Sequence, residues 1–253
     1  MTSTLQQLKQ HLAQAQHNPD VVLLLEHSTS TNDELIQLVQ RSPSIQSALI
    51  CSEQQTQGRG QQKRTWHSPK GNIYFSCLAQ LQRPLDGRFS LEVALNILNC
   101  PTLYHAPLQV KWANDLYSHA GKWGGILIEP ISPSCAVVGI GINLYALDDS
   151  YRSQIEQAYT SLSELNIAFE RTQLIAELYL AVQNAVQWFE FGSKNLVQRF
   201  QHHAYGYQQM VQFSHPTGEC TGSYLGVNEH GALALAQADG VHYFYQGRMR
   251  LME

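Results

Sequence analysis

The feature that most restricts the fold is a glycine- and cation-rich segment at residues 53–76, EQQTQGRGQQKRTWHSPKGNIYFS, between two apolar runs. Gly58 and Gly60 bracket Arg59, and glycine lets a backbone approach a ligand closely. The other cationic or titratable side chains of the segment are Lys63, Arg64, His67 and Lys70. Cations beside such a backbone suit a phosphate or a carboxylate. The segment is therefore predicted to be a loop between two strands that binds an anion.

Length and composition leave room for one large domain, or for one domain and a small module. The chain has 253 residues, of which 43% are hydrophobic and 14% charged, as in ordinary globular proteins. The net charge of −4 argues against sequence-independent binding of nucleic acid. The N-terminus lacks the apolar region of a signal peptide, and no run approaches the ~18 apolar residues of a membrane span. We therefore expect a cytoplasmic protein that has no membrane partner.

The cysteines are expected to be free thiols in a reducing compartment. Their number is odd and no C-x-x-C pair occurs among Cys51, Cys77, Cys100, Cys135 and Cys220. Cys51 and Cys77 lie in apolar, strand-like runs, where a free thiol behaves as a small hydrophobe.

Hydrophobic periodicity predicts a mixed α/β domain over residues 1–205 and a small all-β module over 206–253. Helices are expected at residues 4–16, 89–98, 171–191 and 193–203, with another that starts after the capping residues 30–32. Strands are expected at 21–26, 47–53, 72–81 and 135–144, and residues 110–112 and 125–129 are expected to flank a hairpin that turns near 119–121. After Tyr205, short alternating runs separated by turn signals such as Asp239-Gly240 predict four or five strands.

Two polar features have competing interpretations from the local sequence. Ser30, Thr31 and Asn32 are good helix-capping residues, and capping alone would explain them. Lys111 lies in a strand that should be at least half buried, where lysine is rarely found without a partner. It is either an edge-strand lysine paired with Asp115 or a cation directed at a substrate carboxylate.

Several common motifs are absent. Gly139 and Gly141 begin a dinucleotide fingerprint, but its third glycine would fall at Leu144. Gly121-Lys122 lacks the remainder of a Walker A sequence, and neither G-x-S-x-G nor H-E-x-x-H occurs. His202-His203 is interpreted as a solvated helix end, so no metal-ligating residues are expected.

Six motifs, taken in order, resemble the biotin protein ligase family, also called biotin–[acetyl-CoA-carboxylase] ligase. The resemblance covers residues 21–200, and the C-terminal 45 or so residues resemble the small SH3-like β-barrel that ends this family. The motifs are Ser30-Thr31-Asn32, Gln55 with Gly58-Arg59-Gly60, Arg64-Thr65-Trp66, Lys111-Trp112-x-Asn114-Asp115, Lys122-x-Gly124-Gly125-Ile126-Leu127 and Gly139-x-Gly141-Ile142-Asn143.

The resemblance implies an α+β fold with a mixed-sheet catalytic domain of the biotin/lipoate ligase type. It also implies a ligase that converts biotin and ATP to biotinyl-5′-AMP and passes biotin to one lysine of a carboxylase's biotin carboxyl carrier protein, with Mg²⁺ offsetting the triphosphate charge. Catalytic roles are implied for Lys111, Arg59 and Arg64. Biotin binding is implied for Ser30, Thr31, Asn32, Gln55, Arg59, Gly60, Gln61 and Lys111. Adenylate binding is implied for Arg59, Arg64, Trp66, Lys111 and Asn143.

On this interpretation Lys111 contacts the biotin carboxylate, and Lys111→Ala should abolish adenylate formation while biotin still binds. Tyr159 is either an aromatic that stacks on adenine or an ordinary buried tyrosine. The same resemblance leaves a monomer and a homodimer equally open.

Gln61 departs from the family pattern, which often has arginine after Gly-Arg-Gly, and Lys63 is a candidate to replace that charge. Net loss of a cation there would let biotinyl-AMP escape faster. The dissociation rate of the adenylate, measured beside a Gln61→Arg variant, tests this; equal rates reject it.

The alternative functions are a lipoate ligase or octanoyltransferase of the same fold, and a DNA-binding biotin sensor without chemistry. The former typically carry an Arg-x-x-Gly-Gly-Gly type of loop. Only about twenty residues, with one lysine and no arginine, precede the first strand here, so we expect no DNA-binding domain and no repressor function.

Overall fold

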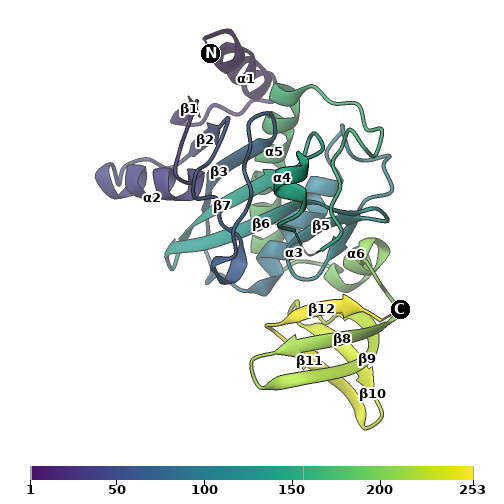
Figure 1. Cartoon of the computed structure of the whole chain (residues 1–253). Coiled ribbons are helices and arrows are strands. Elements are labelled where there is room, and N and C mark those ends of the chain that lie inside the picture. The colour runs from purple at the N-terminus through teal and green to yellow at the C-terminus, as the bar shows by residue number, and fades with distance from the viewer. Residues whose placement is uncertain (1, 156, 253) are drawn as a thin grey trace.

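A seven-stranded mixed sheet forms the centre of the larger domain (Figure 1). The computed structural model describes residues 2–155 and 157–252, without the side chains of Thr2 and Lys63. β1 and β2 are parallel, and every other neighbouring pair in this sheet is antiparallel. In spatial order the strands are β1 (Val21–Leu25), β2 (Ala48–Ser52), β3 (Ile73–Gln80), β7 (Cys135–Ile142), β6 (Gly121–Ser132), β5 (Asp115–Ser118) and β4 (Gln109–Lys111).

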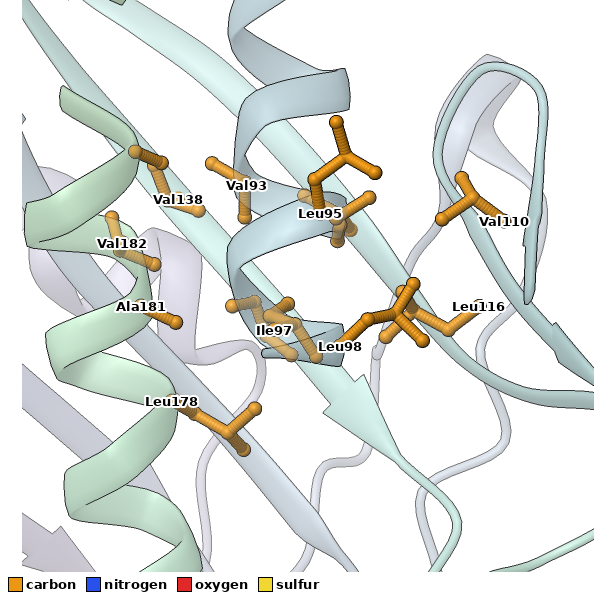
Figure 2. Packing of buried hydrophobic residues seen from close by; sticks show 14 of the residues in the cluster. Val93, Leu95, Ile97, Leu98, Val110, Leu116, Val138, Leu178, Ala181 and Val182 are labelled. Carbon is orange, nitrogen blue, oxygen red and sulfur yellow. The ribbon is translucent and has the colours of Figure 1, made fainter. Parts of the chain in front are cut away.

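One face of this sheet carries the main hydrophobic core. Apolar side chains of the strands alternate, and those at Val138, Ile140 and Ile142 join the core on this face. Helices that contribute to the same core include α1 (Thr2–Gln14), α3 (Gly87–Leu98) and α5 (Arg171–Glu190). Figure 2 shows side chains of α3 and α5 packed beside Val138 of β7.

The opposite face is covered over only part of its width. Helix α2 (Thr31–Arg41) packs there on β2, β3 and β7 through a small cluster that includes Leu35, Ile50 and Val137. The polar segment after β2, with a short 3₁₀ turn η1 (Gln61–Lys63), lies beside this helix. The rest of the face, over β5, β6 and β7, is where a ligand cleft forms.

The C-terminal module is a second, separate sheet, reached through helix α6 (Leu196–His203) (Figure 1). It is wholly antiparallel, in the order β11-β10-β9-β8-β12. Its strands are β8 (Met210–His215), β9 (Gly218–Val227), β10 (Leu233–Gln237), β11 (Gly240–Phe244) and β12 (Arg248–Leu251). The rings of Phe213 and Phe244 lie 4.7 Å apart, so the sheet curls over its own core.

Specific contacts hold the two sheets together. The Tyr205 amide donates to the Val110 carbonyl over 2.9 Å. The Trp112 indole Nε1 donates to the Gly231 carbonyl over 3.0 Å, and its ring lies 6.0 Å from that of Phe213. Because Trp112 belongs to the turn after β4, the smaller sheet has a defined place beside this edge of the larger one.

The α+β class and the mixed sheet are confirmed, and the C-terminal module, predicted to have four or five strands, has five; two details differ. The expected barrel is not closed by hydrogen bonds, since β11 and β12 are unpaired edges within the described range. The residues from 110 to 129 form three strands, and the extra one, β5, is too short and polar to show an apolar pattern. The boundary between residues 205 and 206 remains a prediction, and falls between α6 and β8.

The five cysteines are free, as expected; three are buried, and Cys135 and Cys220 are partly exposed. No helix in the described ranges is both long enough and apolar enough to span a bilayer.

Candidate active site

A single cleft on the α2 side of the large sheet gathers nearly all the residues predicted for binding. The predicted residues that line it are Ser30, Thr31, Asn32, Gln55, Arg59, Gly60, Gln61, Arg64, Trp66 and Asn143. They come from segments as distant as residues 30 and 143, so the fold brings the separate motifs together. Lys111 is the predicted residue that does not line the cleft.

At one end of the cleft, Ser30, Thr31, Asn32 and Gln55 form a neutral hydrogen-bonding corner. The Gln55 Oε1 accepts from the Thr31 amide over 2.9 Å and from the Thr31 hydroxyl over 3.3 Å. The Gln55 Nε2 donates to the Ser68 hydroxyl over 2.9 Å, which fixes the orientation of the amide. Ser30 occupies the N-cap position of α2, but its side chain makes no capping bond. Capping alone therefore does not account for the polar triplet.

Asn32 is buried at this corner, and both its amide oxygen and its amide nitrogen form hydrogen bonds. Its Oδ1 accepts from the Ser76 hydroxyl and its Nδ2 donates to Glu129, each over 2.5 Å. A Cβ atom at residue 139 would collide with the Asn32 Oδ1, so Gly139 is needed for this packing. The first glycine of the Gly139-x-Gly141 pair therefore allows the Asn32 side chain to pack directly against the backbone of β7.

Arg59 is bound by two carboxylates. Its guanidinium contacts both Asp33 oxygens over 2.7 Å and Glu129 over 3.0 and 3.1 Å. The hydrogen bond to Asp33 is the main reason that the pKa of Arg59 is raised. Since this charge is already compensated, Arg59 joins the loop to α2 and β6 in this structure, and a free anion would have to compete with both partners.

The loop around Arg59 folds back on itself. The Gly60 amide donates to the Arg64 carbonyl and the Trp66 amide to the Gly58 carbonyl, both over 2.8 Å. A Cβ atom at Gly58 would lie 2.5 Å from the Trp66 carbonyl oxygen, so a side chain is excluded there. The exposed Arg64 donates to the Gln61 carbonyl at the mouth of the cleft. The Lys63 side chain, expected to offset Gln61, lies outside the described atoms.

Gly125, Gly139 and Gly141 form a glycine floor in the cleft, and the Trp66 indole lies against two of them. A Cβ atom at Gly141 would be 2.6 Å from the indole Nε1, and one at Gly125 would be 3.3 Å from Cζ3. Among the described residues, neither the buried Trp66 Nε1 nor the buried Tyr159 hydroxyl has a hydrogen-bond partner. Buried donors of this kind are normally satisfied, so both are available to a ligand.

Lys122 supplies a cation to this cleft, beside Trp66. Its Nζ lies 2.6 Å from an Asp115 oxygen and 5.1 Å from the Trp66 ring centre, and its side chain is only 12% exposed. Lys122 belongs to one of the six motifs, but no role was predicted for it. It was missed because the glycine floor beside it forms only when β6 and β7 pair.

Lys111 lies outside the described lining of the cleft, and its contact with a substrate carboxylate remains a prediction. Its ammonium lies over the rings of Tyr117 and Tyr205, 4.8 and 5.9 Å from their centres. The carboxylate of Asp115 forms its ion pair with Lys122. Burial lowers the pKa of Lys111 from 10.5 to about 8, the Asp115 charge partly opposes this, and nearby Arg248, Lys122 and Arg250 lower it further.

Replacing Lys111 with methionine should stabilise the fold by about 1–3 kcal/mol at pH 7, since the stem is kept and the buried charge removed. The folded-state pKa lies below the unfolded value, so the wild-type penalty is complete below pH 8 and disappears between about pH 8 and 10.5. Urea unfolding of both proteins at pH 7 and pH 10 measures this. Equal stabilities at pH 7 would contradict it.

The segment after β7 closes another side of the cleft. Asn143 Nδ2 donates to the Thr160 carbonyl over 3.1 Å, and so holds the returning chain. Tyr159 pairs with Lys122 through an isolated bridge and lines the cleft, with the Arg152 guanidinium 5.4 Å from its ring centre. This segment includes the short helix α4 (Asp149–Arg152). Asn143 thus organises the site through the backbone.

Metal ligands are scarce here. The described part of the chain contains no group of three or more His, Cys, Asp or Glu side chains that would hold an ion. Asp115 is the only acidic residue that lines the cleft within that part.

Comparison with known proteins agrees with this geometry. A model of the Biotin/lipoate A/B protein ligase family matches residues 24–143. The bifunctional ligase/repressor BirA of Escherichia coli K12 is 30% identical over 222 residues, which are 84% of this chain and 68% of that protein. The biotin–[acetyl-CoA-carboxylase] ligase of Mycobacterium tuberculosis is 29% identical over 169 residues, 63% of this chain and 62% of that one.

Solved structures show the same fold. A biotin protein ligase from Aquifex aeolicus in complex with biotin and ATP has a TM-score of 0.78 at 21% identity, over 92% of this chain and all of that one. A biotin acetyl coenzyme A carboxylase synthetase from Helicobacter pylori with bound biotinylated ATP has a TM-score of 0.63 at 19% identity, over 88% and 99%.

Proposed function

The chain belongs to the biotin protein ligases of the biotin/lipoate A/B protein ligase family, and from its cleft we propose how it activates biotin and transfers it. Biotin and ATP react to give biotinyl-5′-AMP and pyrophosphate, and biotin then passes to a lysine of a carboxyl carrier protein. The main support is one cleft with a neutral hydrogen-bonding corner at one end and Lys122 beside Trp66 at the other.

In the first step a biotin carboxylate oxygen attacks the α-phosphorus of ATP and pyrophosphate leaves. The ureido ring is proposed to bind at the corner of Ser30, Thr31 and Gln55, whose polar groups suit a neutral ligand. The carboxylate then points toward Lys122, with the adenine near Trp66. No protein nucleophile is required, so the protein acts by positioning and by stabilising the growing negative charge.

In the second step the amine of the carrier lysine attacks the carbonyl carbon of the mixed anhydride, and AMP leaves. Lys122 would stabilise the phosphate as its bond to carbon breaks. The segment at 145–159, whose Leu147 and Tyr159 line the cleft, would limit access of water to the adenylate.

Mg²⁺ is proposed to enter with ATP, because this ion usually binds through substrate phosphates and one or two carboxylates. Asp115 is the carboxylate that the cleft offers to it. The ion would reduce the repulsion between the triphosphate and the incoming carboxylate.

The carrier is proposed to be the biotinylated subunit of a carboxylase, and the protein is proposed to work in the cytoplasm without DNA. A monomer or a homodimer fits equally. Lipoate ligase or octanoyltransferase activity is the alternative within the same family, and the named biotin ligases among the relatives favour biotin.

Incubating the purified protein with a carrier domain, ATP and either biotin or lipoate tests the proposal. A mass increase of the carrier that requires both biotin and ATP is expected. Modification by lipoate alone, or no adenylate from biotin, would overturn it.

A further inference from the structure

We propose that Asn72 and Arg171 are positioning residues that hold the segment after β7 over the cleft, and so determine how long biotinyl-5′-AMP stays bound. Neither residue belongs to the described lining of the cleft, so each would act through the chain that it holds in place. The inference rests on the proposed function, because it concerns the intermediate that this reaction forms.

Asn72 fixes the start of that segment. The residue lies directly before β3 and is 3% exposed. Its Oδ1 accepts from the Leu144 amide over 2.8 Å and from the Tyr145 amide over 3.0 Å. Leu144 and Tyr145 follow β7 closely, so one side-chain oxygen satisfies two successive amides where the chain leaves the sheet.

The far end of the segment returns to the same place. The Ser163 amide donates to the Leu144 carbonyl over 3.0 Å, while the Leu144 amide donates to Asn72. Between these two ends the segment reaches the cleft, which Leu147 and Tyr159 line. Asn72 therefore lies at the closed base of the loop that covers the cleft.

Arg171, the first residue of α5, holds Asn72 in turn. Its Nη2 and Nε donate to the Asn72 carbonyl over 3.2 and 3.4 Å. Its Nη1 lies 2.7 Å from a Glu53 oxygen, in an ion pair whose side chains are 19% and 20% exposed. Glu53 follows β2 and Asn72 precedes β3, so one guanidinium joins both ends of the loop that carries Arg59 and Trp66.

Both walls of the cleft therefore depend on Asn72. The loop with Arg59 and Trp66 ends at this residue, and the segment after β7 begins against it. An adenylate between these walls leaves when the segment moves away, so a weaker hold on its start raises the population of open conformations and the rate of escape. The groups proposed to act on the reacting atoms, Lys122 among them, are not touched. Loss of Asn72 should thus affect retention of the adenylate more than its formation.

Pyrophosphate release in the absence of a carrier protein separates these two effects. An enzyme that retains its adenylate gives a burst equal to the enzyme concentration and then a slow steady rate. Asn72→Ala is expected to raise the steady rate about tenfold, because two buried amides lose their acceptor, and to change the rate constant of the burst by less than about threefold. Arg171→Gln should raise the steady rate less, since Asn72 keeps its own bonds to Leu144 and Tyr145.

Two further variants serve as controls. Asn72→Asp keeps an acceptor oxygen for the two amides and should retain the adenylate almost as well as wild type. Asp20→Ala is the matched control, because the Asp20 Oδ2 also accepts from two successive amides, those of Gln46 and Ser47, over 2.9 and 3.0 Å. These residues precede β2, whereas the cleft loop follows it, so the steady rate should stay at the wild-type value.

An unchanged steady rate in both Asn72→Ala and Arg171→Gln would overturn the inference. So would an equal increase in Asp20→Ala, which would indicate a general loss of stability. A wild-type protein that forms no adenylate would instead refute the proposed function. Trypsin cleavage after the exposed Arg152 then tests the hold on the segment separately, and it should be faster in Asn72→Ala than in wild type or Asp20→Ala. Equal cleavage rates would overturn the inference.

Discussion

Replacing Lys122 with methionine is expected to lower the rate of adenylate formation by about 10²–10³-fold at saturating ATP and biotin. Among the described side chains, Lys122 is the lysine that lines the cleft, 12% exposed and next to both Asp115 and the Trp66 ring. Removing one preorganised donor at a reacting centre typically has an effect of this size. The measurement is pyrophosphate release, with biotin binding followed separately by calorimetry.

Biotin affinity should fall much less than the rate, because the hydrogen-bonding corner at Thr31 and Gln55 is not touched. Lys122→Arg retains an ion pair with Asp115, and so separates loss of charge from altered geometry; circular dichroism would report on folding. Near-wild-type release by Lys122→Met, together with complete loss in Lys111→Met, would contradict this expectation and would support the catalytic role predicted for Lys111.

Replacing Arg199 with alanine is expected to destabilise the protein by about 3–5 kcal/mol, the cost of leaving a buried charge without its partner. Glu92 on α3 is fully buried and accepts from Arg199 on α6 over 2.6 and 2.8 Å. The same guanidinium lies 4.1 Å from the centre of the Trp188 ring. Urea unfolding at neutral pH gives the free-energy difference.

The double variant Glu92→Leu/Arg199→Met is the control, because replacing a buried ion pair with apolar side chains of similar size is often neutral. It should recover most of the lost stability. If Arg199→Ala lowers the free energy of unfolding by less than about 1 kcal/mol, water reaches Glu92 and the ion pair contributes little to stability.

The local sequence pattern was sufficient to predict most helices and strands of this fold. Capping residues located the start of α2. Apolar spacing located α3, α5 and strands β1 to β3 to within a few residues, because their buried faces repeat regularly. β5 was missed because a four-residue strand that begins with Asp115 is too short to show an alternation of apolar and polar residues. The open edges of the C-terminal sheet could not be predicted, since strand count does not determine whether edges meet.

The sequence predicted which residues lie in the cleft better than it predicted the role of each. The motifs contain most residues that line the cleft, yet the finding that Lys122 lines it and Lys111 does not depends on sheet order, because β4 is an edge strand and β6 is central. Likewise, the carboxylates that hold Arg59 lie at Asp33 and Glu129, 26 and 70 residues away in sequence. Such contacts depend on sheet order, which short motifs do not encode.

The floor of the cleft at Gly125, Gly139 and Gly141 is backbone, and this limits how the enzyme can be re-engineered. A methyl group at residue 139 meets Asn32, and one at residue 141 meets Trp66, so neither position can be varied to reshape the cavity. A variant that accepts a bulkier biotin analogue must therefore gain its space from the covering side, by trimming Trp66 or altering the loop at residues 145–159. Libraries directed at the floor would mostly yield inactive proteins.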